Sequence, residues 1–251
     1  MFPIFNLGPF AVQSKGFILL IGTYLSLMLM NRYGKKVYST DDRIENLIII
    51  TIIGGIVGAR FGFFLQNFNI FKDNLVEIFS FNSAMLNVEF GILTSIVLAI
   101  VYGQRRNLLN WKSMDVISVF IVSILPIYHF SNFASGSDYG FPTNSTWIMT
   151  NLGIGLHPIQ LYETLGGILI LFSLVVRTRA LSKKAFSIDG LQFLIVLGLN
   201  ILLRHMLEPL YAQSPLMFNQ IHIIQIATWF SMLMISILIL KKLNPKIKQE
   251  Y

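Results

Sequence analysis

The 251-residue chain contains no cysteine, so it carries no disulfide, no thiol nucleophile and no thiolate metal site. Charged residues are also scarce. They make up 12% of the sequence, whereas a soluble domain carries about 25%. Because so few charges could not cover a water-exposed surface, and 54% of the residues are apolar, the sequence predicts an integral membrane protein. The first 14 residues lack a basic stretch, so no cleavable signal peptide is expected.

A helix that spans a bilayer requires about 20 mainly apolar residues. Seven apolar stretches reach or approach this length. They cover residues 16–30, 48–65, 85–102, 116–130, 158–176, 190–203 and 221–240. The first, fourth and sixth are short, so they are expected to extend into their polar flanks. With no internal repeat and no low-complexity linker, the prediction is an all-α protein: one seven-helix bundle domain over residues 1–251.

The basic residues predict how the bundle is oriented. Of the 19 Lys and Arg residues, 15 lie after the first, third or fifth stretch or in the C-terminal tail. By the positive-inside rule these loops and the C-terminus are cytoplasmic, and the N-terminus is outside. The net charge of +7 is therefore attributed to cytoplasmic loops, and no nucleic-acid partner is expected.

With this orientation, the polar residues in or next to the stretches gather in the outer half of the bundle. They include Arg60, Glu89, His129, Asn132, His157, Gln160, Glu163, Arg204 and Glu208. Ionisable groups at membrane depth are costly and therefore mark candidate functional sites. A one-sided cluster favours the handling of a lipid headgroup or an exported polypeptide over an ion pathway. The alternative is that these side chains simply extend toward water from helix ends.

Local spacing adds detail to this cluster. His157, Gln160 and Glu163 recur every three residues and share one helix face, with Glu163 about 9 Å deeper than His157. Arg204 and Glu208 are one turn apart and are able to pair. The alternatives are that Gln160 bonds a neighbouring helix and that the Arg204–Glu208 pair is an ordinary surface pair.

Residues 157–163 read His-Pro-Ile-Gln-Leu-Tyr-Glu, which resembles the His-Pro-x-Gln-Leu-Tyr-Glu motif of bacterial prolipoprotein diacylglyceryl transferases. Similar matches to that family occur at residues 4–9, 58–62, 132–136, 139–140, Arg204 with Glu208, and Gln225. The resemblance implies a seven-helix inner-membrane enzyme with its N-terminus outside. Such an enzyme moves the diacylglyceryl group of phosphatidylglycerol onto the lipobox cysteine of an exported preprotein and releases glycerol phosphate.

The chain departs from the family pattern at four positions. His129 stands at a position where the resemblance implies arginine, and Ser137 where it implies glutamate, with Asp138 next to it. Lys15 replaces a tyrosine and Glu89 replaces a histidine.

The resemblance also implies roles for the candidate residues. Arg60 and Arg204 are the expected phosphate ligands, because arginine binds phosphate with two parallel hydrogen bonds. His157 is the first candidate for the base, and His129 or Glu89 is expected to share that work. Glu163 and Glu208 orient or neutralise the arginines. Headgroup contacts are expected from Asn132, Gly140, Gln160 and Tyr162. No metal or cofactor is expected.

Two other functions remain open on the sequence alone. One is a non-catalytic relative that binds lipid or a lipoprotein precursor. The other is a lipid transporter or a different enzyme on the same scaffold.

Overall fold

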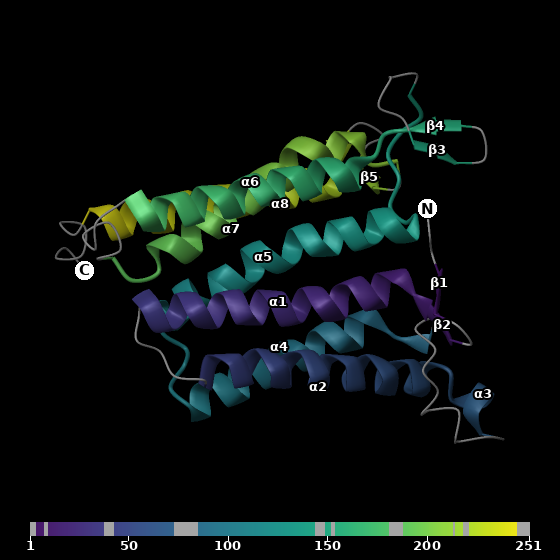
Figure 1. Cartoon of the computed structure of the whole chain (residues 1–251), viewed down its shortest axis with the longest axis horizontal. Helices are drawn as coiled ribbons and strands as arrows, with labels where there is room; N and C mark the ends of the chain where they lie inside the picture. Colours follow the sequence, from purple (N-terminus) through teal and green to yellow (C-terminus); the bar gives the residue numbers. More distant parts are fainter. Residues whose placement is uncertain are drawn as a thin grey trace. The chain divides into compact units, whose positions relative to one another are not determined.

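The computed structural model describes residues 4–7, 10–37, 43–72, 85–143, 149–151, 154–180, 188–212, 214–217 and 221–244. In these ranges seven helices are long and apolar enough to cross a membrane, which confirms the predicted seven-helix membrane protein. They are α1 (Ser14–Val37), α2 (Arg43–Gln66), α4 (Val88–Arg105), α5 (Trp111–Ser135), α6 (Ile159–Ala180), α7 (Leu191–Leu207) and α8 (Ile223–Leu243) (Figure 1). As expected, the first, fourth and sixth of these helices extend beyond their apolar stretches.

Short elements lie before and between the long helices. They are the four-residue helix α3 (Phe68–Phe71), the 3₁₀ turn η4 (Glu208–Leu210) and six strands in three antiparallel hairpins. The hairpins pair β1 (Ile4–Leu7) with β2 (Phe10–Gln13), β3 (Met149–Asn151) with β4 (Ile154–Leu156), and β5 (Leu216–Met217) with β6 (Ile221–His222). None of the hairpins was predicted from the sequence.

The chain forms two compact units, which are described separately. The smaller unit covers Gly34–Ser113 and the larger unit covers Met1–Tyr33 with Met114–Tyr251. In the smaller unit α2 and α4 pack closely because glycines of α2 face side chains of α4. A Cβ on Gly55 would lie 2.1 Å from Ser95 Oγ, and one on Gly58 would lie 2.2 Å from Thr94 Oγ1. Only glycine permits this approach, as is common between membrane helices.

In the larger unit α7 packs against both α6 and α8 (Figure 1). The start of α7 is attached to α5 by the fully buried Asp115. Its carboxylate accepts from the backbone N–H of Gly190 at 2.6 Å and from that of Phe193 at 2.8 Å. These N–H groups have no acceptor within their own helix, so Asp115 caps α7 from another helix.

The segment after α5 joins the ends of three helices. Gly140 forms a β-bridge with Tyr211, which follows α7, and donates its N–H to the carbonyl of His157, just before α6. A Cβ on Gly140 would lie 2.7 Å from Ile159 Cδ1 and 2.8 Å from His157 Cβ. The absence of a side chain at residue 140 therefore allows these backbones to meet, and the meeting point lies beside the polar cluster described next.

Candidate functional site

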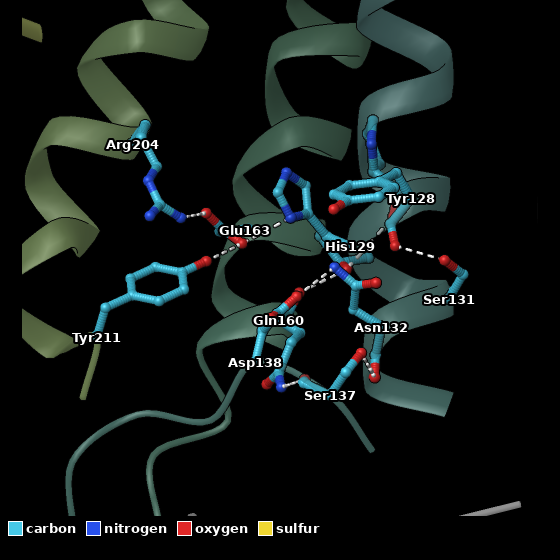
Figure 2. Close-up of polar contacts among 12 residues, drawn as sticks. Tyr128, His129, Ser131, Asn132, Ser137, Asp138, Gln160, Glu163, Arg204 and Tyr211 are labelled. Atoms are coloured by element: carbon cyan, nitrogen blue, oxygen red, sulfur yellow. Dashed lines mark hydrogen bonds and ion pairs between the residues drawn. The ribbon is translucent and has the colours of Figure 1, made fainter. Parts of the chain in front are cut away.

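Glu163 in the second turn of α6 is the centre of a polar cluster in the larger unit, and its side chain is 3% exposed. Its Oε1 lies 3.1 Å from Arg204 Nη1, and its Oε2 lies 2.6 Å from His129 Nδ1. The same Oε2 accepts a hydrogen bond of 2.6 Å from the Tyr211 hydroxyl. Figure 2 shows the three partners pointing at the carboxylate from α5, from α7 and from the segment after α7. A buried carboxylate requires such partners to remain charged.

Arg204 is held on several sides. Its Nη2 pairs with Glu208 Oε2 at 2.7 Å, so the pairing predicted from their one-turn spacing is present. Glu208 is fully buried, and its Oε1 lies 3.6 Å from His222 Nδ1. The guanidinium carbon lies 3.8 Å from the centroid of the Tyr211 ring, a cation–π contact. The plane of the guanidinium is thus set by two carboxylates and one aromatic face.

His129 and Glu163 form a histidine–carboxylate pair. A carboxylate at Nδ1 favours the tautomer that carries its proton on Nδ1 and leaves Nε2 as a proton acceptor. The His129 side chain is 19% exposed, so the ring is not sealed inside the protein. The pair therefore has the arrangement of a general base with an orienting group.

A cavity of about 280 Å³ lies beside these groups. It is lined by Tyr128, His129, Asn132, Asp138, Tyr139, Arg204, Tyr211, Ser214, Pro215 and Ile224. An imidazole, a guanidinium and an amide thus face one space. Together with the Asp138 carboxylate, which lines the same cavity, they offer both hydrogen-bond donors and acceptors to a polar ligand.

Two buried amides next to the cluster each have an oxygen without a protein donor. Asn132 donates through Nδ2 to Asp138 Oδ2 at 2.8 Å, and Gln160 donates through Nε2 to the backbone oxygen of Ser137. Within the part of the chain that the structure describes, Asn132 Oδ1 and Gln160 Oε1 have no hydrogen-bond partner. Because a buried acceptor without a donor is costly, each oxygen is suited to a hydroxyl or water donor. Asn132 lines the cavity, whereas Gln160 is fully buried and is not part of the lining.

The structure brings together many of the residues singled out in the sequence. His129, Glu163, Arg204 and Glu208 form the cluster, and Asn132 lines the cavity beside it. Gly140 lies next to the cluster because its backbone forms the β-bridge with Tyr211.

Other predicted residues lie apart from the cavity lining. The Nδ1 of His157 lies 3.4 Å from the Tyr162 hydroxyl, and neither residue lines the cavity. Arg60 and Glu89 belong to the smaller unit, where Arg60 donates to the backbone oxygen of Met85 at 2.9 Å and Glu89 is exposed in the first turn of α4. Their parts in the site stay predictions.

Tyr211 is the main residue that the sequence did not reveal. It follows the 3₁₀ turn η4, which comes after the end of α7 at Leu207, so it belongs to no helical stripe, and its aromatic hydroxyl is the one sign of a role in the sequence. Burial and the hydrogen bond to Glu163 raise the pKa of the Tyr211 phenol. The hydroxyl consequently remains a donor at all physiological pH values.

Metal ligands are not grouped in the described ranges. In those ranges no set of three or more His, Asp or Glu side chains is placed to hold a metal ion.

Known proteins are similar to this chain over most of its length. Residues 3–241 match the family model described as prolipoprotein diacylglyceryl transferase. Three relatives are named phosphatidylglycerol–prolipoprotein diacylglyceryl transferase. The protein from Photobacterium profundum is 30% identical over 202 residues, which cover 78% of this chain and 75% of the relative. The Clostridium botulinum protein is 27% identical over 220 residues, covering 84% and 85%. The Finegoldia magna protein is 28% identical over 160 residues, which cover 64% of each chain.

Proposed function

The chain belongs to the prolipoprotein diacylglyceryl transferase family, and from this premise we propose the reaction that it catalyses. It transfers the diacylglyceryl group of phosphatidylglycerol to the cysteine thiol in the lipobox of an exported prolipoprotein. The observation that carries the proposal is the Glu163-centred cluster beside a polar cavity, near one end of apolar spanning helices. A lipid headgroup and a polar peptide would meet at such a position.

The transfer is a substitution at carbon. The cysteine sulfur attacks the carbon of the diacylglyceryl group that bears the phosphate, so a C–S bond forms and the C–O bond between that carbon and the phosphate breaks. The bonding electrons leave with glycerol phosphate, and the thiol proton passes to a base. The protein must therefore remove a proton and stabilise charge on a departing phosphate.

His129 is the proposed base. A cysteine thiol has a pKa of about 8.5, so a base must raise its thiolate fraction at neutral pH. Glu163 lies at Nδ1, and His129 lines the cavity, so Nε2 is suited to accept the proton. His157, the first candidate from the sequence, contacts Tyr162 instead. Geometry thus favours the alternative base over the first choice.

Arg204 is the proposed ligand of the leaving phosphate. It lines the cavity, and Glu163, Glu208 and Tyr211 hold its guanidinium in one orientation. A donor that is already oriented toward the developing charge stabilises the transition state without reorganisation. The unpaired oxygen of Asn132, which lines the cavity, accepts from a glycerol hydroxyl of the headgroup.

The site is proposed to act at the outer leaflet of the bacterial cytoplasmic membrane, with the N-terminus outside. The distribution of Lys and Arg supports this orientation. Reporter fusions within residues 181–187 should report a cytoplasmic position. An external reporter at this loop would reverse the orientation.

The activity is tested with purified protein, phosphatidylglycerol labelled in its acyl chains, and a lipobox peptide. The cysteine peptide should acquire the diacylglyceryl mass and the label while glycerol phosphate is released. A matched peptide with serine in place of cysteine should remain unmodified. Binding of lipid and peptide without transfer would contradict the proposal and favour the non-catalytic alternative.

A further inference from the structure

The polar cluster and the cavity lining carry more negative than positive charge, so an anionic lipid needs a further cation there. The carboxylates of Glu163 and Glu208 face a single guanidinium, that of Arg204. His129 must be neutral before it accepts a proton. Asp138, which lines the same cavity, adds a further negative charge. A phosphodiester entering this site would meet net negative charge, even with His222 protonated, and like charges repel strongly where water is scarce. Binding of the phosphate therefore calls for a second cation.

Lys15 in the first turn of α1 is positioned to supply that cation. Its ammonium nitrogen lies 5.7 Å from the centroid of the Tyr128 ring, and Tyr128 lines the cavity. The rings of Tyr128 and His129 are 5.4 Å apart, edge to face. The Lys15 side chain is half-buried. Its four-carbon stem is flexible, so the ammonium can move from the Tyr128 face toward a ligand.

The other basic side chains described in the larger unit lie far from the cavity. Arg32 is 17 residues further along α1, which corresponds to about 25 Å. Lys241 and Lys242 occupy the last turn of α8, whereas the first turn of that helix lies at the cavity through Ile224. Among the Lys and Arg side chains described in the larger unit, Lys15 is thus the one placed to complement Arg204.

We propose that Lys15 is a second phosphate ligand of the lipid site, and that it approaches from the Tyr128 side while Arg204 approaches from the other. The inference rests on the proposed function. A lysine ammonium is a compact, mobile point charge, so it suits capture of the phosphate, whereas the fixed guanidinium suits stabilisation of the transition state. A contact made equally in the bound lipid and in the transition state affects KM and leaves kcat unchanged.

The test compares Lys15→Gln and Lys15→Arg with a matched control, Lys36→Gln, which removes an exposed lysine from the last turn of the same helix. Lys15→Gln should raise the KM for phosphatidylglycerol about tenfold, the typical effect of losing one charge-assisted contact. The kcat and the KM for the peptide should change by less than about threefold. Lys15→Arg and Lys36→Gln should resemble the wild type in both KM values.

A binding measurement separates this inference from the proposed function. Glycerol phosphate binding, followed by calorimetry without peptide, should weaken about tenfold in Lys15→Gln. That result would support the phosphate contact even if the wild type transferred no lipid, an outcome that would refute the proposed function alone. Wild-type KM and wild-type glycerol phosphate binding in Lys15→Gln would overturn the inference. A loss of folded protein with unchanged binding per folded molecule would also overturn it.

Discussion

The guanidinium of Arg204 lies against the face of the Tyr211 ring, 3.8 Å from its centroid. The hydroxyl of the same tyrosine donates to Glu163, which also pairs with Arg204. Tyr211 thus touches both members of an ion pair, one through its ring and the other through its oxygen. The contact fixes the direction in which the guanidinium presents its remaining donors to the cavity.

Replacement of Tyr211 by phenylalanine and by leucine should separate the ring from the hydroxyl. Tyr211→Phe retains the stacked ring and loses a hydrogen bond to a charged group, which is worth about 1.5–3 kcal/mol. We expect kcat/KM to fall by roughly 10- to 150-fold. Tyr211→Leu should lose more activity because it also removes the cation–π contact.

The pH dependence provides a check on Tyr211. Its raised pKa means that the folded protein favours the neutral phenol. The stabilisation from this hydrogen bond is therefore present below the ordinary pKa of 10.0 and is lost only as pH rises through the higher folded value. Below about pH 10, kcat/KM of the wild type and of Tyr211→Phe should therefore depend on pH in the same way on the alkaline side. An alkaline decrease in kcat/KM that is present in the wild type and absent from the variant would mean that Tyr211 ionises during turnover.

His129→Gln tests the proposed base. The variant should lose about 10²- to 10⁴-fold in kcat, the usual contribution of a positioned base. Its residual activity should increase with pH toward the thiol pKa of about 8.5, because solvent must then supply the thiolate. His157→Gln is the matched control and should lose less than about tenfold. A larger loss in His157→Gln than in His129→Gln would return the role of base to His157.

Arg204→Ala should lose roughly 2.7–4 kcal/mol of transition-state stabilisation, by analogy with removal of one oxyanion donor. The transfer rate of Arg204→Lys should lie between that of the alanine variant and that of the wild type, because lysine keeps the charge but lacks the planar pair of donors. The measurement is the rate of transfer to a lipobox peptide, with protein yield and thermal stability recorded alongside. Full activity in Arg204→Ala would remove the residue from the mechanism, whereas loss of the protein itself would make it structural.

Asp115 provides a prediction about stability. In Asp115→Asn one of the N–H groups of Gly190 and Phe193 would face an amide NH₂, so we expect the free energy of unfolding to fall by about 1.5–3 kcal/mol. Asp189→Asn removes the same charge next to Gly190 and should be nearly neutral. Thermal unfolding in detergent measures both. Activity per folded molecule should be unchanged, since Asp115 precedes His129 by 14 residues of α5, about 21 Å.

The sequence predicted well the features that depend on one helix at a time. Arg204 and Glu208 pair because residues four apart on a helix are neighbours whatever surrounds them. Asn200 lies one turn before Arg204 and shares its helix face, yet its side chain donates to the carbonyl of Val196 in its own helix. Spacing thus shows which residues share a face, but it does not reveal which of them turn toward a partner.

By itself, the sequence determined the number of membrane helices, because a bilayer requires long apolar stretches and imposes this length on the chain. It also determined that Glu163 would need a partner, since a carboxylate at that depth is costly alone. Only the tertiary structure decided that the partners are His129, Arg204 and Tyr211. They come from separate segments, and their meeting depends on how α5, α6 and α7 pack and on the bridge between Gly140 and Tyr211. Such contacts join residues far apart in the chain, so no local periodicity encodes them.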